Sequence, residues 1–464
     1  MLSLGIDLGT GGVRCIVTEQ DGLVVDEHET SLKEINKAKR KGESEQNPLD
    51  WISALEATLD KIFSSSRNKD IRAVAIDGTS GTIVPVNKNG DFMGNALMHN
   101  DMRAHVEAIE CAEIFNGKCS PTFSLPKILW MQKNLRLTDE VLYKHASDVL
   151  YSWLSGIIET PTDFTNAMKT GVDLETQKWK DHPLLNSLNL PKVIAPGQVF
   201  GNLSLNLRKK WNLTHEVLLV AGATDSNSAF YASGASQLGD WASTIGTTLA
   251  IKGLSDARIS DNEGRIYCHK HPSGLWLPGG ASNAGGEIVR CNFSGREQSI
   301  EKSLLASPPS INGLVYPSVR NGERMPVADK DFTPFNTIKN SCEKSFYLAC
   351  LEGIAFTERM VFELVESLGG RTDGKLIALG GTTRSSLGMQ IRSNLLQKTL
   401  SLPANPNSAF GSAILATAGY LNQTVSQTSE TMVRFKKEIH PSSKVDESLE
   451  EKYQQFRELC FQSR

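Results

Sequence analysis

The sequence contains few cysteines and no long apolar run, and both absences limit what the protein can be. Its 464 residues include 8 cysteines, scattered without a C-x-x-C pair, a pattern that argues against a disulfide scaffold and favours a reducing compartment. No segment approaches the roughly 20 apolar residues that a membrane-spanning helix needs. The first residues already read as a strand, so we expect no signal or transit peptide within this chain.

The chain also lacks a charge excess, with 49 basic and 52 acidic side chains and a net charge of -3. This balance gives no electrostatic reason to expect nucleic acid or a membrane surface as a partner. The basic run at residues 37–41 lies among glutamates and reads as a solvated loop rather than a phosphate-tracking patch. Cys268, His269 and His271 resemble part of a metal site, but no second Cys/His cluster nearby completes four ligands, so zinc is the less favoured interpretation.

Chain length and an internal repeat indicate two domains. A chain of this size exceeds the usual single hydrophobic core. Residues 2–17 alternate apolar and polar side chains on either side of a Gly-Thr turn, which predicts a β-hairpin, and residues 241–251 repeat the pattern. We therefore predict two similar α/β domains, residues 1–236 and 237–464. An amphipathic helix at residues 445–461 is expected on the outside, where it can pack back on the first domain.

Gly-Thr turns beside strands are suited to phosphate binding. Consecutive amides can point into one anion-binding concavity, and a threonine adds a hydroxyl. Thr10 lies in such a turn, and Asp7 stands at the end of the preceding strand. A carboxylate beside phosphates would repel them unless a cation lies between, so Asp7 predicts hydrated Mg²⁺. For this turn alone, a tight hairpin with a surface aspartate is the structural alternative.

Two common nucleotide motifs are absent from the sequence. Gly117-Lys118 is followed by Cys119, so no G-x-x-x-x-G-K-[ST] occurs there, and no G-x-G-x-x-G stands between a strand and a helix. If phosphates are bound, another architecture binds them.

A series of short motifs runs in one order along most of the chain. They are residues 7–14 (DLGTGGVR), 125–130 (LPKILW), 162–167 (TDFTNA), 222–225 (GATD), 246–247 (GT), 322–326 (GERMP), 351–355 (LEGIA) and 380–390 (GGTTRSSLGMQ). The series resembles the FGGY family of carbohydrate kinases, within the actin/Hsp70/sugar-kinase superfamily. The resemblance implies two RNase-H-like domains flanking an interdomain cleft, the first binding sugar and the second binding ATP.

The resemblance also implies a role for each predicted site residue. Asp225 is the catalytic general base, which accepts the proton of a sugar hydroxyl as its oxygen attacks the γ-phosphorus of ATP; helix capping is the alternative for this residue alone. The substrate-binding residues are Asp7, Thr10, Ser80, Gly81 and Asp225. The ATP-binding residues are Gly9, Thr10, Gly11, Gly246, Thr247, Gly380, Gly381, Thr382 and Gln390. Asp7 also holds Mg²⁺ through water, and we expect Asp7 and Asp225 to face each other across the gap between the domains.

Several positions depart from the typical family pattern. Thr79-Ser80 stands where xylulokinases carry Met-His, and His99 stands where many members have Trp. Ser385 replaces a usual Asn, and Asn407 replaces a usual Glu. These departures do not change the predicted reaction class. They leave the identity of the sugar and the affinity for nucleotide undecided.

The sequence therefore predicts an ATP-dependent kinase of a small ketose. The most similar branch is the short xylulokinase-like group of cyanobacteria and plant plastids, which implies D-ribulose as substrate, with D-xylulose as the alternative. A sugar or nucleotide sensor and a sugar-independent ATPase are the rival functions. Asp101 and Arg103 match another cleft segment, although a structural ion pair fits them equally well. A monomer or homodimer is expected, in the chloroplast stroma of a plant or otherwise in the cytoplasm.

Overall fold

The computed structural model describes residues 1–36, 40–137, 140–306, 313–339, 342–442 and 447–462. Part of the basic run, residues 37–39, and the first two residues of the predicted terminal helix lie outside these ranges. The chain divides into two units. Unit 1 comprises Met1–Ala232 and Asn405–Val433, and unit 2 comprises Ser233–Ala404 and Arg434–Arg464.

The return of Asn405–Val433 to unit 1 corrects the expectation that everything after residue 236 belongs to the second domain. A periodicity argument along the sequence assigns each segment to its neighbours in the chain. This segment instead packs on strands that lie some 400 positions earlier, as the bond between Ser408 and Asp7 shows, with a sequence separation of 401.

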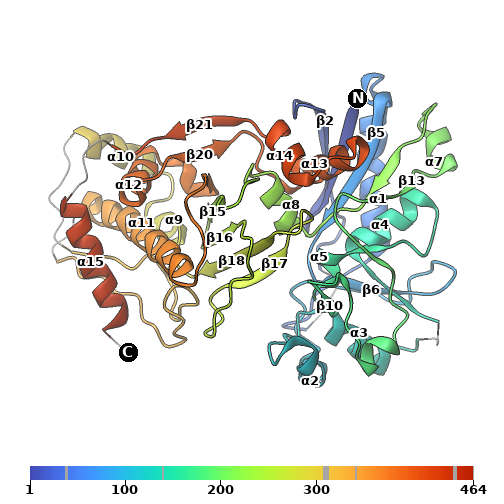
Figure 1. The fold of residues 1–464 in the computed structure, drawn as a ribbon, viewed down its shortest axis with the longest axis horizontal. Helices are drawn as coiled ribbons and strands as arrows, with labels where there is room; N and C mark the ends of the chain where they lie inside the picture. The colour runs from blue at the N-terminus through green and yellow to red at the C-terminus, as the bar shows by residue number, and fades with distance from the viewer. Residues whose placement is uncertain (37–39, 138–139, 307–312, 340–341, 443–446, 463–464) are drawn as a thin grey trace. The chain divides into compact units, whose positions relative to one another are not determined.

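A six-stranded mixed sheet forms the core of unit 1 (Figure 1). In spatial order its strands are β13 (Val199–Asn202), β14 (Leu218–Val220), β5 (Ile71–Gly78), β1 (Leu2–Leu8), β2 (Gly12–Glu19) and β3 (Val24–Ser31). The strands β14, β5 and β1 are parallel, whereas β13, β2 and β3 run antiparallel to their neighbours. The predicted first hairpin is confirmed, since Leu8 pairs with Val13 across the Gly-Thr turn.

Helices cover both faces of this sheet because side chains alternate along β1. Leu4 and Ile6 join an apolar core with Leu55 and Leu59 of α1 (Pro48–Ser64) and residues of α4 (Ala146–Ser155). The intervening positions, among them Gly5, face α13 (Ser408–Leu421), which also contacts α8 (Asp225–Tyr231).

Glycine allows α13 to approach both neighbours closely. A Cβ on Gly5 would lie 1.9 Å from the Ala409 carbonyl oxygen, and a Cβ on Gly411 would lie 1.8 Å from the Ser228 carbonyl oxygen of α8. Real Cβ atoms do not reach such distances, so these two positions require glycine. The docking of α13 therefore depends on two glycines, Gly5 and Gly411, that are far apart in the sequence.

The remaining elements of unit 1 surround this layer. A second sheet has the order β4 (Glu45–Gln46), β7 (Ala96–Leu97), β6 (Ile83–Val86) and β8 (Leu142–His145). The strand pairs β10 (Val172–Asp173) with β11 (Lys178–Trp179), and β12 (Val193–Ile194) with β9 (Thr162–Asp163), are short. The other helices and 3₁₀ turns are η1 (Arg67–Asp70), α2 (His105–Glu110), η2 (Glu113–Phe115), α3 (Ser124–Asn134), α5 (Phe164–Ala167), α6 (Pro183–Asn186), α7 (Leu205–Lys210) and α14 (Val425–Met432).

Unit 2 repeats the strand plan of unit 1. Its sheet has the order β17 (Tyr267–Lys270), β18 (Trp276–Ser282), β16 (Leu249–Gly253), β15 (Trp241–Ile245), β19 (Leu376–Leu379), β20 (Leu400–Pro403) and β21 (Phe435–Ile439). As in unit 1, a parallel trio (β15, β19 and β20) is flanked by antiparallel strands, and β15 and β16 form a hairpin about a Gly-Thr turn. The two sheets therefore confirm the predicted pair of similar RNase-H-like α/β folds, with β17 an additional edge strand.

The helices of unit 2 centre on α11. They are α9 (Glu287–Phe293), α10 (Glu297–Ala306), α11 (Glu343–Ser367), η3 (Gly381–Arg384), α12 (Ser386–Leu396) and α15 (Glu447–Phe461). The terminal helix α15 buries Tyr453 and Phe456 in one apolar cluster with Phe356 of α11. It therefore belongs to unit 2, which corrects the expectation that it packs back on the first domain. Among the described residues, no helix has both the length and the apolar character to cross a membrane.

Replacing Gly411 by alanine tests the close docking of α13. The added methyl group would overlap the Ser228 carbonyl, so we expect Gly411→Ala to lower the free energy of unfolding by about 1–3 kcal/mol. Denaturant titration followed by circular dichroism measures this change. Gly201→Ala is the matched control, because a Cβ there meets no atom within 4 Å. Equal stability of the two variants would contradict the packing described.

Candidate active site

Three aspartates meet at one edge of the unit 1 sheet. Asp7 and Asp77 are paired residues near the carboxyl ends of β1 and β5. Asp225 begins α8 directly after Thr224, which forms a parallel bridge with Gly78. The carboxyl ends of parallel strands lie at the same sheet edge, which brings the three carboxylates together. Asp7 and Asp225 both belong to unit 1, with β5 between their strands, which corrects the expectation that they face each other across the gap between the domains.

Asp77 is the member of this group that the sequence prediction did not include in the site. Its side chain is fully buried and accepts a hydrogen bond from the Ser412 hydroxyl of α13 at 2.7 Å. Burial raises the pKa of Asp77 well above its ordinary value, and the nearby charges of Asp7 and Asp225 raise it further. Burial therefore favours the neutral, protonated form of Asp77 over the ionised form. An aspartate at the end of a second strand was the available signal.

Hydrogen bonds from Ser408 and Gln46 hold the turn after β1 in place. Ser408 donates to Asp7 Oδ2 at 2.7 Å, and the buried Gln46 amide donates to the Thr10 carbonyl at 2.8 Å. Gly9 N–H bonds the Gly12 carbonyl at 3.0 Å and closes the turn. Among the described residues, the N–H groups of Thr10 and Gly11 donate to no protein acceptor. Two amides with spare donors, next to an exposed threonine, fit an oxygen anion.

A short chain of hydrogen bonds fixes the position of Asp225. Thr224 N–H donates to Thr165 Oγ1 at 2.9 Å, and that hydroxyl donates to Asp163 Oδ1 at 2.5 Å. Asp163 also caps α5 by accepting from two backbone N–H groups. Gly222 allows the chain to pass β5, since a Cβ there would lie 1.7 Å from the Ile76 carbonyl oxygen. The TDFTNA motif therefore acts as a support for the strand end that carries Asp225.

The Ser80-Gly81 loop rests on lysines that the sequence prediction did not assign to the site. Gly81 has a φ of +91°, a left-handed conformation suited to glycine. The fully buried Lys127 donates to the carbonyls of Gly81, Met98 and Thr122 at 2.9, 2.6 and 2.9 Å. Burial lowers the pKa of Lys127 to about 7. Its three bonds match the three donors of an ammonium group and tie three segments of the loop region together.

Asp101 and Arg103 form a structural ion pair, the alternative left open from the sequence. Arg103 donates to both carboxylate oxygens of the buried Asp101 at 2.8–3.0 Å. Arg103 also bonds Glu45 at 2.6 Å and lies over the Trp130 ring. These contacts occupy the guanidinium within unit 1.

Apart from Gln390, which lies on α12, the predicted nucleotide residues of unit 2 follow the carboxyl ends of β15 and β19. Thr382 Oγ1 donates to the Ile245 carbonyl at 3.0 Å, directly before Gly246 and the exposed Thr247. Gly380 has a φ of +88° and packs against the same carbonyl, which a Cβ would approach to 2.5 Å. A Cβ added to Gly246 or to Gly381 would have no other atom within 4 Å, so open space lies beside both glycines.

Glycine also holds the neighbouring segment close. A Cβ on Gly285 would lie 2.6 Å from the Thr247 carbonyl oxygen, and one on Gly286 would lie 2.7 Å from the Gly246 carbonyl oxygen. These two residues were not predicted from the sequence. The Gly-Gly pair after β18 was the available signal.

Gln390 and two of the departures from the family pattern have local roles. Gln390 Nε2 donates to the His440 carbonyl and to Asn394 Oδ1, both at 2.9 Å, so its amide nitrogen is engaged within unit 2. Ser385 caps α12 through Gly388 N–H, and Asn407 caps α13 through Phe410 N–H. A serine and an asparagine are good N-cap residues, which gives each replacement a structural use.

No zinc site forms in the part of the chain that the structure describes, which has no group of three His, Cys, Asp or Glu side chains able to hold a metal ion. Cys268 Sγ bonds the Ile259 carbonyl instead, and His271 Nδ1 bonds the Ser273 hydroxyl at 2.7 Å. A hydrated Mg²⁺ needs only one or two carboxylates, so Asp7 stays a candidate for it.

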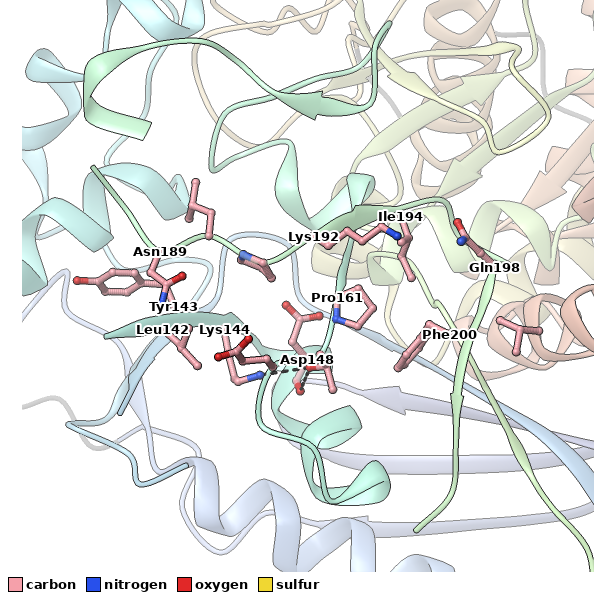
Figure 2. Close-up of a pocket in the computed structure, with 15 residues that line it drawn as sticks. Leu142, Tyr143, Lys144, Asp148, Pro161, Asn189, Lys192, Ile194, Gln198 and Phe200 are labelled. Carbon is pink, nitrogen blue, oxygen red and sulfur yellow. Dashed lines mark hydrogen bonds between the residues drawn. The ribbon is translucent and has the colours of Figure 1, made fainter. Parts of the chain in front are cut away.

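Unit 1 also contains a cavity of about 430 Å³ between α4, β8 and β13 (Figure 2). Lys144, Asp148, Lys192 and Phe200 lie among its lining residues, and Lys144 donates to the Thr160 hydroxyl at 3.2 Å. None of the predicted site residues lines this cavity. It is therefore distinct from the carboxylate edge of the sheet.

Two RNase-H-like units with Gly-Thr hairpins define the actin/Hsp70-like class of fold. Within that class, residues 2–231 match the N-terminal domain of the FGGY family of carbohydrate kinases, and residues 243–420 match its C-terminal domain. The chain belongs to the FGGY family of carbohydrate kinases, and it is an ATP-dependent phosphotransferase with an alcohol group as acceptor.

Individual relatives are distant but cover nearly the whole chain. A xylulose kinase of Bacillus subtilis is 25% identical over 452 residues, which cover 90% of this chain and 88% of the relative. A gluconokinase of the same organism is 24% identical, with 89% and 86% covered. The crystal structure of a "xyloylose kinase" from Brucella ovis has a TM-score of 0.86 at 22% identity, covering 99% of this chain and 98% of that chain. A glycerol kinase from Plasmodium falciparum with ADP has the same TM-score at 17% identity, with 100% and 98% covered.

Asp77→Asn tests whether folding raises the pKa of the buried Asp77 carboxyl group. In the wild type the folded state keeps a proton that the unfolded state loses above a pKa of about 3.9, so stability falls as pH rises from there. Asp77→Asn keeps the shape without titrating, and its advantage over wild type should grow by about 1.4 kcal/mol per pH unit within that window. Urea unfolding at pH 5, 6 and 7 measures the difference. Asp70→Asn, at an exposed carboxyl group that pairs with Arg72 outside this cluster, is the control; a curve for Asp77→Asn that runs parallel to that of the wild type would disprove the assignment.

Proposed function

We propose that this sugar kinase phosphorylates a small ketose, with D-ribulose as the preferred substrate and D-xylulose as the alternative. The observation that carries the proposal is the position of Asp225 beside Asp7 and Asp77 at one sheet edge. Relatives named xylulose kinase support a pentulose. Ser80, where xylulokinases carry histidine, favours a sugar other than xylulose.

Asp225 acts as the general base in this proposal. A sugar hydroxyl has a much higher pKa than a carboxyl group, so Asp225 takes the proton as the hydroxyl oxygen attacks phosphorus, and not before. Ser80 and Gly81 contribute the loop that contacts the sugar. Positioning and charge neutralisation supply most of the remaining acceleration, because phosphoryl transfer requires little covalent chemistry from the protein.

Each unit by itself offers glycine-rich turns that fit part of an ATP molecule. The spare N–H donors at Thr10 and Gly11 fit its terminal phosphates, and the open space before Gly246 and Gly381 fits a ligand lying against the backbone. Thr247 adds a hydroxyl at the phosphates, and Gly380 to Thr382 would lie against the adenosine. Asp7 would hold Mg²⁺ through water, and the bound ion would neutralise phosphate charge.

Asp225→Asn separates a kinase from a sensor on the same fold. Loss of the base should lower kcat by about 10²–10⁴-fold, while binding of sugar persists. ADP release in a coupled assay, over a panel of D-ribulose, D-xylulose, D-gluconate and glycerol, measures the activity and identifies the acceptor. A wild-type protein that binds ketose without turnover would be a sensor, and one that hydrolyses ATP fully without sugar would be an ATPase.

Thr165→Val tests the support beneath Asp225. The variant removes the hydroxyl that links Asp163 to Thr224 N–H, so Asp225 shifts and kcat should fall about 10-fold or more per folded molecule. Thr417→Val is the matched control, because it removes a buried hydroxyl bonded to Ser3 in the same unit at 2.8 Å. Both variants lose stability, and only Thr165→Val should lose turnover; equal kcat in the two variants would contradict the supporting role.

A further inference from the structure

Lys169 is a lysine of the Ser80-Gly81 region whose use the proposed function does not explain. It follows α5, and its backbone carbonyl accepts from Leu125 N–H at 3.1 Å, which anchors the residue to the start of α3. Its ammonium donates to the Ser80 carbonyl at 3.1 Å and lies 5.8 Å from the centre of the Phe123 ring. The side chain is therefore directed to the loop predicted to contact the sugar.

Gly81 makes room for this side chain. A Cβ on Gly81 would lie 3.2 Å from Lys169 Cδ and 3.6 Å from Lys169 Nζ. Besides the left-handed backbone of Gly81, the Thr122 carbonyl oxygen, 2.9 Å from such a Cβ, disfavours a larger residue there, and the lysine stem would have to shift slightly. The Lys169 side chain therefore packs directly against Gly81.

The ammonium stands in an electrostatic setting suited to a polar ligand. Its surroundings include the Asp225 carboxylate, which raises the pKa of Lys169, although burial is the larger effect and lowers it. Burial is the main cause that lowers the pKa of Lys127 and of His99, and the charge of Lys169 lowers both further, so Lys169 lies close to both. His99 Nδ1 is buried and has no hydrogen-bond partner among the described residues. The Asp225 carboxylate and an unpartnered imidazole nitrogen of His99 therefore belong to the electrostatic surroundings of the Lys169 ammonium.

An ammonium has three donors, and protein acceptors satisfy only part of this capacity at Lys169. Among the described residues, its side-chain hydrogen bond goes to the Ser80 carbonyl alone. Lys169 is half-buried and has spare donors. A substrate with many oxygen acceptors would gain binding free energy there, because charge-assisted hydrogen bonds are stronger than neutral ones.

We propose that Lys169 is a substrate-binding residue that donates hydrogen bonds to oxygen atoms of the ketose, and so sets which sugars reach Asp225. This inference rests on the proposed function. The ammonium binds hydroxyl or carbonyl oxygens of the sugar, while Ser80 holds the lysine in place through its backbone carbonyl. Because a backbone carbonyl is the anchor, the identity of residue 80 can change without releasing the lysine.

Lys169→Met tests the proposal against a matched control. Lys180 also donates to a backbone carbonyl, that of Ile114 at 2.5 Å, and also lies 5.8 Å from a phenylalanine ring, that of Phe115, so Lys180→Met removes the same kind of side chain elsewhere in unit 1. With D-ribulose, Lys169→Met should raise the sugar KM by about 10- to 100-fold, with the KM for ATP nearly unchanged. Lys180→Met should match the wild type, and Lys169→Arg should recover part of the loss.

The outcomes separate this inference from the proposed function. A wild-type enzyme that phosphorylates D-ribulose or D-xylulose, with an unchanged sugar KM in Lys169→Met, would overturn only the role of Lys169. A wild-type enzyme inactive on every ketose would overturn the proposed function, and the assignment of a ketose to Lys169 with it. If Lys169→Met does not fold, Lys169→Gln, which keeps a donor but no charge, is measured instead; it too must raise the sugar KM.

Discussion

The convergence of three carboxyl groups at the ends of parallel strands is the constraint on which the site depends. Parallel pairing of β14, β5 and β1 forces the residues that follow each strand to one edge. Three ionised carboxylates there would repel one another strongly. The fold lowers this cost by burying the middle one, Asp77, because burial raises the pKa of its carboxyl group and so favours the neutral form.

The same edge depends on a helix from the far end of the chain. Through Ser408 and Ser412, α13 donates to Asp7 and to Asp77. Its close approach requires Gly5 on the strand and Gly411 on the helix. The positions of the carboxylates and the docking of residues 405–433 are therefore one packing solution, and a change in either affects the other.

The surroundings of Asp225 and Ser80 show how backbone atoms prepare a site. Asp163 and Thr165 hold the backbone before Asp225, while Lys127 and Lys169 bond carbonyls of the Ser80-Gly81 loop. These supports bond mainly to main-chain atoms, so they constrain geometry more than they constrain which side chains face the substrate. This arrangement is consistent with departures such as Ser80 and His99 within an unchanged framework.

Sequence alone determined the two hairpins, the duplicated strand plan and the family, because alternation, glycine turns and ordered motifs are local signals. It also singled out Asp7, Asp225 and the Gly-Thr turns by residue type. Only the tertiary structure decided that Asp7 and Asp225 lie at one sheet edge, that residues 405–433 belong to unit 1, and that Asp77 and Lys169 lie in the electrostatic surroundings of Asp225. Such facts follow from burial and from contacts across hundreds of residues, and neither leaves a periodic trace in the chain.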